Sequence, residues 1–91
     1  MKIVWTDEAI DDLKSIHDYI AKDSIRSAKR LSTRIIGKVE ILIEFPISGR
    51  MVPEFQNEAV RELIEGKYRI VYRVNEQSIE IIRIHHGSRL F

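Results

Sequence analysis

The sequence predicts an α+β domain of order β-α-α-β-β-β, in which an antiparallel helical hairpin packs on one face of a small antiparallel sheet. Apolar residues recur at helical spacing through the first half of the chain. Three runs of β-branched and aromatic residues, separated by turn residues, fill the last third. A chain of 91 residues with 44% hydrophobic content is expected to form one domain, residues 1–91.

Lys2 to Trp5 is a short β-branched run, which is stable only if it joins the later sheet. Thr6 occupies the position of an N-cap, and the helix that follows is expected to end near Lys22. Its apolar face consists of Ala9, Leu13, Ile16 and Ile20. This segment is therefore expected to be an amphipathic helix with one buried side.

A second helix is predicted from about Ile25 to about Phe45, because Asp23 and Ser24 offer a new N-cap and Pro46 ends the apolar pattern. The connection between the two helices is short, so they are expected to pack antiparallel and to cover one side of the sheet. From Pro46 to about Glu58 the chain has no sustained period and is expected to be a loop.

Side-chain alternation assigns the two faces of the sheet. It points Tyr68, Ile70, Tyr72 and Val74 toward the helices, and Arg69, Val71 and Arg73 away from them. In the last strand it points Ile82 and Ile84 toward the helices, and Ile81, Arg83 and His85 away. The second face would then be basic and would expose Val60, Ile64, Val71 and Ile81, so we expect a partner to cover it.

The distribution of charge along the chain says more about possible partners than the net charge does. The net charge of +1 gives no argument for nucleic-acid binding, but residues 66–91 hold five basic and two acidic residues. The absence of cysteine excludes disulfides, a thiolate nucleophile and a cysteine zinc site. No apolar run approaches the roughly 18 residues of a membrane span, and the N-terminus lacks a signal pattern. We therefore expect a soluble, cytoplasmic protein.

Several motifs in this order resemble the RelE/ParE superfamily of toxins from type II toxin–antitoxin modules. These motifs are W-x-x-x-A-x-x-D-L from Trp5, P-x-x-G-R-x-V-P-E from Pro46, R-E-L from Arg61, Y-R-I-V-Y-R-V from Tyr68 and I-I-R-I-H-H-G-S-R-L from Ile81. Together they cover essentially the whole chain. The resemblance implies a growth-inhibiting toxin that a cognate antitoxin holds silent, with no cofactor.

The resemblance leaves the cellular target open between two branches. ParE-like members poison DNA gyrase and have no established nuclease chemistry, and the long helical hairpin favours this branch. RelE-like members are endonucleases that cleave mRNA in the ribosomal A site. A third possibility is a degenerate member that has lost toxicity and survives as a binding module.

As a RelE-like nuclease, the chain would stabilise the phosphate charge with Arg69 and Arg89, and Glu54 or His86 would carry the proton. The preceding strand departs from that branch. Its basic-side positions are Val60 and Glu62 where other RelE-like nucleases have lysines, and Glu62 could neutralise Arg69 by pairing.

As a ParE-like toxin, the chain would use its cations for recognition of gyrase or the antitoxin. The candidate contact residues are Arg50, Arg69, Arg73, Arg83 and His85. No metal site is expected, because adjacent residues of a strand point to opposite faces and His85 and His86 could not share one ion.

Overall fold

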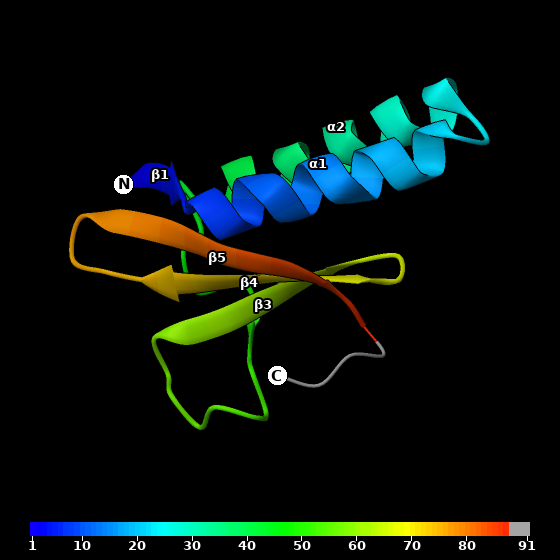
Figure 1. Ribbon diagram of the computed structural model, residues 1–91. Coiled ribbons are helices and arrows are strands. Elements are labelled where there is room, and N and C mark those ends of the chain that lie inside the picture. The colour runs from blue at the N-terminus through cyan, green and yellow to red at the C-terminus, as the bar shows by residue number, and fades with distance from the viewer. Residues whose placement is uncertain (88–91) are drawn as a thin grey trace.

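The computed structural model describes residues 1–87, which form two layers with a helical hairpin lying along one face of a twisted sheet (Figure 1). The elements are β1 (Lys2–Trp5), α1 (Asp7–Ala21), α2 (Ile25–Ile41), β2 (Arg50–Met51), β3 (Val60–Glu65), β4 (Tyr68–Val74) and β5 (Ser78–His86). The strand order in this part of the chain is β1-β5-β4-β3-β2. The predicted fold class is confirmed. The sheet is mixed rather than purely antiparallel, because β1 pairs parallel to β5.

Side-chain caps fix both helix starts. The Thr6 hydroxyl accepts a hydrogen bond from the Ala9 amide at 3.0 Å and donates one to the Ile82 carbonyl at 2.8 Å, so the cap also ties α1 to β5. The Ser24 hydroxyl accepts from the Ser27 amide at 3.1 Å. None of the helices within residues 1–87 is both long and apolar enough to cross a membrane.

Helix α2 ends at Ile41, four residues earlier than the predicted end at Phe45. The Leu42 amide bonds to the Val39 carbonyl at 3.0 Å, a tighter pattern than the α-helical one, and the chain then turns. The same i→i−3 bonding continues through Ile43 and Glu44, so the last turn before Pro46 is tightened rather than α-helical. Residues 42–45 therefore leave the helix before the proline is reached.

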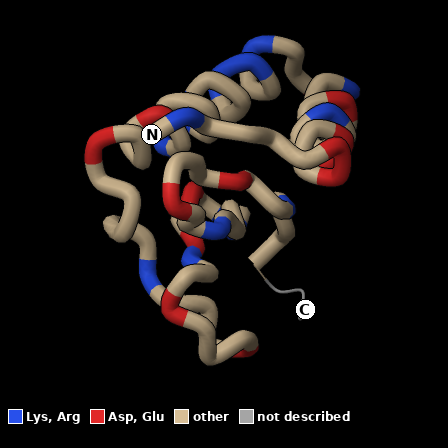
Figure 2. Tube along the Cα trace, turned by 90° about the vertical axis from the view of Figure 1, so that its left-hand side faces the viewer, with Lys and Arg blue, Asp and Glu red and all other residues tan. Residues whose placement is uncertain are grey.

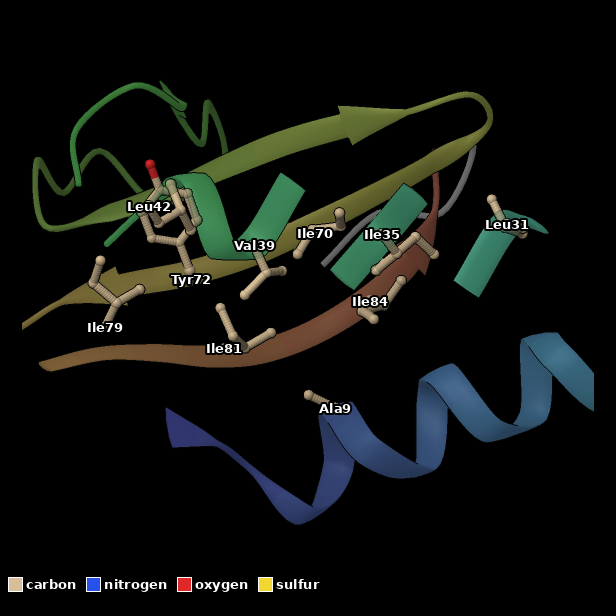
Figure 3. Packing of buried hydrophobic residues seen from close by; sticks show 10 residues of the cluster. All are labelled: Ala9, Leu31, Ile35, Val39, Leu42, Ile70, Tyr72, Ile79, Ile81 and Ile84. Atoms are coloured by element: carbon tan, nitrogen blue, oxygen red, sulfur yellow. The ribbon is translucent and has the colours of Figure 1, made fainter. Parts of the chain in front are cut away.

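The main core lies between the hairpin and the sheet (Figure 3). Its buried members are Ala9, Leu31, Ile35, Val39, Leu42, Ile70, Tyr72, Ile79, Ile81 and Ile84. Tyr68 and Trp5 pack against this cluster, so both aromatic side chains contribute to the core. The register of the predicted strand over residues 68–74 is also confirmed, since Ile70 and Tyr72 are buried beneath the helices.

A β-bulge in β5 changes which isoleucines face the helices. Val71 pairs with Arg83 but Tyr72 pairs with Ile81, so Ile82 is an extra residue on this strand. Ile81 is fully buried in the main core, whereas Ile82 lines a small apolar pocket with Val71 on the opposite face. The predicted placement of Ile81 and Ile82 was therefore wrong, because strict alternation does not allow for an inserted residue.

The face opposite the helices is covered by the chain itself. Val52 packs against Val60 and Val71 in a second buried cluster, while Ile64 stays 43% exposed. β2, which was predicted as loop, pairs with β3 and brings this segment onto the sheet. The predicted exposure was wrong for Val60 and Val71, because the residues after Gly49 supply the cover that a partner was expected to provide, and it was right for Ile64.

Candidate functional site

Arg69 stands at the centre of four charged side chains on the covered face of the sheet. We call Arg50, Glu54, Glu62 and Arg69 the Arg69 cluster. Its Arg69 Nε donates to Glu62 Oε1 at 2.6 Å, and its two terminal nitrogens donate to the two Glu54 oxygens, each at 2.9 Å. Arg50 Nε donates to the other Glu62 oxygen. The pairing of Glu62 with Arg69 that the sequence suggested is thus present.

The cluster is neutral, and its two central side chains are buried while Arg50 and Glu54 are exposed. Arg69 is 7% exposed and Glu62 1% exposed, and the two positive charges balance the two negative ones. The hydrogen bonds from Arg69 hold the pKa of Glu54 well below its usual range, at about 2. The same bonds to Glu54 raise the pKa of Arg69. Glu54 is therefore ionised at neutral pH. With two arginines and two glutamates, the cluster offers little net charge to a ligand.

Glu54 should make the free energy of unfolding depend on pH in the acidic range. Its pKa falls from an ordinary value of 4.5 in the unfolded chain to about 2 on folding, so its stabilising effect is complete above about 4.5 and disappears as the pH falls toward 2. Glu54→Gln removes this effect. We expect the difference in urea midpoint between wild type and Glu54→Gln to be largest at pH 7 and to shrink steadily between pH 5 and pH 3.

Glu58→Gln is the matched control, because it neutralises an exposed glutamate of the same segment that forms no ion pair with Arg50 or Arg69 among the described residues. Its difference from wild type should change little over that pH range. A Glu54→Gln difference that stays constant from pH 7 to pH 3 would show that the Glu54–Arg69 pair does not stabilise the fold.

The end of the sheet beside the cluster is hollowed into a cleft of about 310 Å³. Its lining includes Arg50, Lys67, Arg69 and His86. The His86 ring packs edge-on against Tyr68, with ring centroids 5.8 Å apart, whereas His85 lies opposite Arg69 in the strand register. The structure therefore brings Arg50, Arg69 and His86 to one cleft and joins Glu54 to them through Arg69.

Three other candidate residues lie elsewhere. Arg83 reaches the edge of the sheet and makes two hydrogen bonds to Asp12 on α1, at 2.7 and 3.1 Å. Arg73 is exposed near the far end of β4, where it pairs in register with Val60. Arg89 lies outside the described residues. The expectation that the arginines group on one open surface was therefore wrong, because ion pairs hold Arg69 and Arg83 at separate places.

Asp12 holds α1 against β5, a role that sequence reasoning missed. It accepts from the Ile84 amide at 2.9 Å as well as from Arg83. Burial alone would raise the pKa of Asp12, but the hydrogen bonds from Arg83 and the Ile84 amide outweigh burial and lower it. The only sequence signal was its place in the W-x-x-x-A-x-x-D-L motif.

A larger groove, the α1 groove, runs between α1 and the ends of β4 and β5. Its volume is about 670 Å³, and its lining includes Asp12, Ile16, Tyr19, Lys67, Tyr68 and His86. The Tyr19 side chain is 71% exposed beside it. Both apolar and polar side chains line the groove, so it is suited to an amphipathic protein segment.

Comparisons with known proteins agree on one group. The profile of the family described as "ParE toxin of type II toxin-antitoxin system, parDE" matches residues 3–91. A protein named "Toxin RelE2" from Caulobacter vibrioides is 35% identical over 89 residues, which is 98% of each chain.

Two solved structures share the fold. A chain from the chromosomal ParDE system of P. aeruginosa superposes with a TM-score of 0.77 at 28% identity, over 94% of this chain and 95% of that one. A chain of the toxin–antitoxin complex RelBE2 from Mycobacterium tuberculosis gives a TM-score of 0.68 at 18% identity, over 93% and 95%.

Proposed function

We propose that this chain, which belongs to the ParE toxin family of type II toxin–antitoxin systems, poisons DNA gyrase by binding to it and does not cleave RNA. The observation that carries this proposal is the state of Arg69. Its guanidinium makes three hydrogen bonds to Glu54 and Glu62, and Arg69 itself is only 7% exposed.

Cleavage of RNA without a metal needs cations that stabilise the charge developing on the phosphate. A phosphate approaching Arg69 would meet two carboxylates and would have to displace at least Glu54. Arg50 is likewise paired with Glu62. The charge of the cluster is zero, so the cleft would have to rely on Lys67 and His86 for any net attraction.

Glu54 is also poorly suited to proton transfer in this cleft. A general acid works best with a pKa near the working pH, whereas the pKa of Glu54 is about 2. Glu54 is therefore an ionised partner of Arg69 at neutral pH and cannot supply a proton. This leaves His86 as the proton carrier of the nuclease alternative among the described candidates.

One observation favours the alternative, a RelE-like ribosome-dependent mRNA endonuclease. The cleft gathers Arg50, Lys67, Arg69 and His86, which are the residue types that such chemistry uses, and a relative covering the whole chain is named "Toxin RelE2". On this reading, binding to the ribosome would have to release Arg69 from Glu54.

We also propose that a cognate antitoxin silences the toxin by filling the α1 groove. Two of the structural neighbours come from toxin–antitoxin systems. The groove is the largest of the hollows described above, and it presents the exposed ring of Tyr19 beside Ile16. An amphipathic antitoxin segment could bury these side chains and pair with Lys67.

The deciding experiment uses toxin that has been purified with its antitoxin, released and refolded. Gyrase supercoiling and ribosome-dependent RNA cleavage are measured side by side, for the wild type and for His86→Gln. We expect inhibition of supercoiling by both proteins and no RNA cleavage by either.

RNA cleavage that is lost in His86→Gln would establish the endonuclease and overturn the proposal. Full binding of the antitoxin with no effect in either assay would also overturn it, and would support a binding module without toxicity. If the wild type still inhibits supercoiling after the antitoxin is added, only the proposed silencing by the antitoxin is contradicted.

A further inference from the structure

The two helices of the hairpin carry opposite charges that the net charge of the chain conceals. Helix α1 holds five acidic residues and one basic residue, and α2 holds five basic residues and one acidic residue. Their net charges are −4 and +4. Figure 2 shows acidic segments gathered on α1 and basic ones on α2. The hairpin is therefore strongly polarised across its width.

Most of the positive charge of α2 forms a row. Arg26, Arg30, Arg34 and Lys38 follow one another at intervals of four residues, so they lie along one flank of the helix. Lys38 donates to the Ile64 carbonyl on β3, which places this flank on the side of the sheet away from α1. We call these four residues the α2 row.

The outer half of the row is not neutralised. Arg34 and Lys38 both pair with Glu65, at 3.1 and 3.5 Å. Arg26 and Arg30 are exposed and make no ion pair within the part of the chain that the structure describes. Because Arg26 and Arg30 have no acidic partner there, the outer half of the row carries a local positive potential.

We infer that the α2 row binds the phosphate backbone of duplex DNA. Each four-residue step advances about 6 Å along the helix, so the row presents several cations side by side to a backbone that carries one negative charge per about 3.4 Å of axis on each strand. Arginine forms bidentate hydrogen bonds with phosphate, which suits it to this contact. The inference does not depend on the identity of the toxin target.

The composition of α2 favours duplex DNA over single-stranded nucleic acids. Single-stranded nucleic acids are held largely by stacking on aromatic side chains, and α2 has no aromatic residue. Contacts from the row would be to the backbone alone, so binding should be independent of sequence.

The test measures binding of the purified toxin to a fluorescent 20-base-pair duplex between 50 and 200 mM salt, for the wild type and for Arg26→Gln/Arg30→Gln. We expect affinity of the variant to be about tenfold weaker at the lowest salt. Its plot of log affinity against log salt should be shallower by about 0.9 per arginine removed. Two unrelated duplex sequences should give the same result.

The control is Lys2→Gln/Lys14→Gln, which lowers the net charge equally at two exposed positions outside α2. It should bind within about twofold of the wild type. Equal thermal unfolding of the variants shows that neither pair of substitutions disturbs the fold. Because the assay contains no gyrase, its result is separate from that of the supercoiling test.

Four results would overturn the inference. The first is a wild-type affinity that does not depend on salt, and the second is equal weakening by the control pair. The third is tighter binding of single-stranded RNA of the same length than of the duplex. Loss of antitoxin binding in Arg26→Gln/Arg30→Gln, with no duplex binding by the wild type, would identify the row as an antitoxin contact instead.

Discussion

Arg69→Met should lower the free energy of unfolding by about 3 kcal/mol, at the low end of the usual cost of breaking a buried ion pair. The substitution leaves Glu62, which is 1% exposed, with only one of its two arginine partners. It also releases Glu54 and so removes the link that holds its loop to the sheet. Arg50 still reaches Glu62, which limits the loss. Urea denaturation at pH 7 gives the value.

Adding Glu62→Leu should recover most of this loss. The double variant replaces a charged pair with apolar side chains of similar volume, and such replacements in protein interiors are often neutral. Glu62→Leu alone leaves Arg69 with Glu54 and should be destabilised less than Arg69→Met. If Arg69→Met unfolds at the same urea concentration as the wild type, the cluster does not stabilise the fold.

The same pair of variants separates a structural role of Arg69 from a direct contact with the target. A loss of toxicity in Arg69→Met could come from the fold alone. The double variant restores the fold without restoring the guanidinium. Recovered toxicity would show that Arg69 acts through the structure, whereas a stable but inactive double variant would show that the guanidinium itself contacts the target.

Local chemistry predicts the Arg69 cluster only in part. Alternation places Arg69 and Val71 opposite Ile70 and Tyr72, and the chance of pairing between Glu62 and Arg69 follows from two adjacent strands. The partnership with Glu54 does not follow, because the segment after Gly49 has no period that would reveal its path. That path depends on close packing.

Gly49 shows why such packing is not readable from the chain. Its amide donates to the Tyr72 hydroxyl at 2.9 Å, and a Cβ at this position would lie 2.6 Å from the Glu62 carbonyl oxygen. Only glycine allows the backbone to come this near the sheet. A glycine before a loop has many possible reasons, and the fit to β3 and β4 appears only when the strands are in place.

Unlike the path of the segment after Gly49, the opposite charges of α1 and α2 can be read from the sequence by counting the charged residues of each helix. The net charge of +1 conceals it, because the opposite charges of the two helices cancel. What the sequence does not provide is the flank on which the α2 row lies. The contact of Lys38 with β3 fixes that flank.

The bulge in β5 leads to the second large effect, which is expected for Ile81→Ala. Ile81 is fully buried among side chains of both helices and the sheet, so its truncation should cost about 2–5 kcal/mol through lost burial and the cavity left behind. Ile82→Ala removes the same atoms from a half-buried side chain at the apolar pocket on the other face. We expect it to cost less than half as much.

This pair tests the bulge itself, because the two substitutions are chemically identical and adjacent. Without the inserted residue, regular alternation would bury Ile82 beneath the helices and expose Ile81, and the order of the two costs would be reversed. Urea midpoints at pH 7 therefore distinguish the two registers directly. A larger loss for Ile82→Ala would mean that β5 continues without a bulge. Arg83 and Ile84 would keep their faces in either case, because the inserted residue changes the placement of Ile81 and Ile82 only.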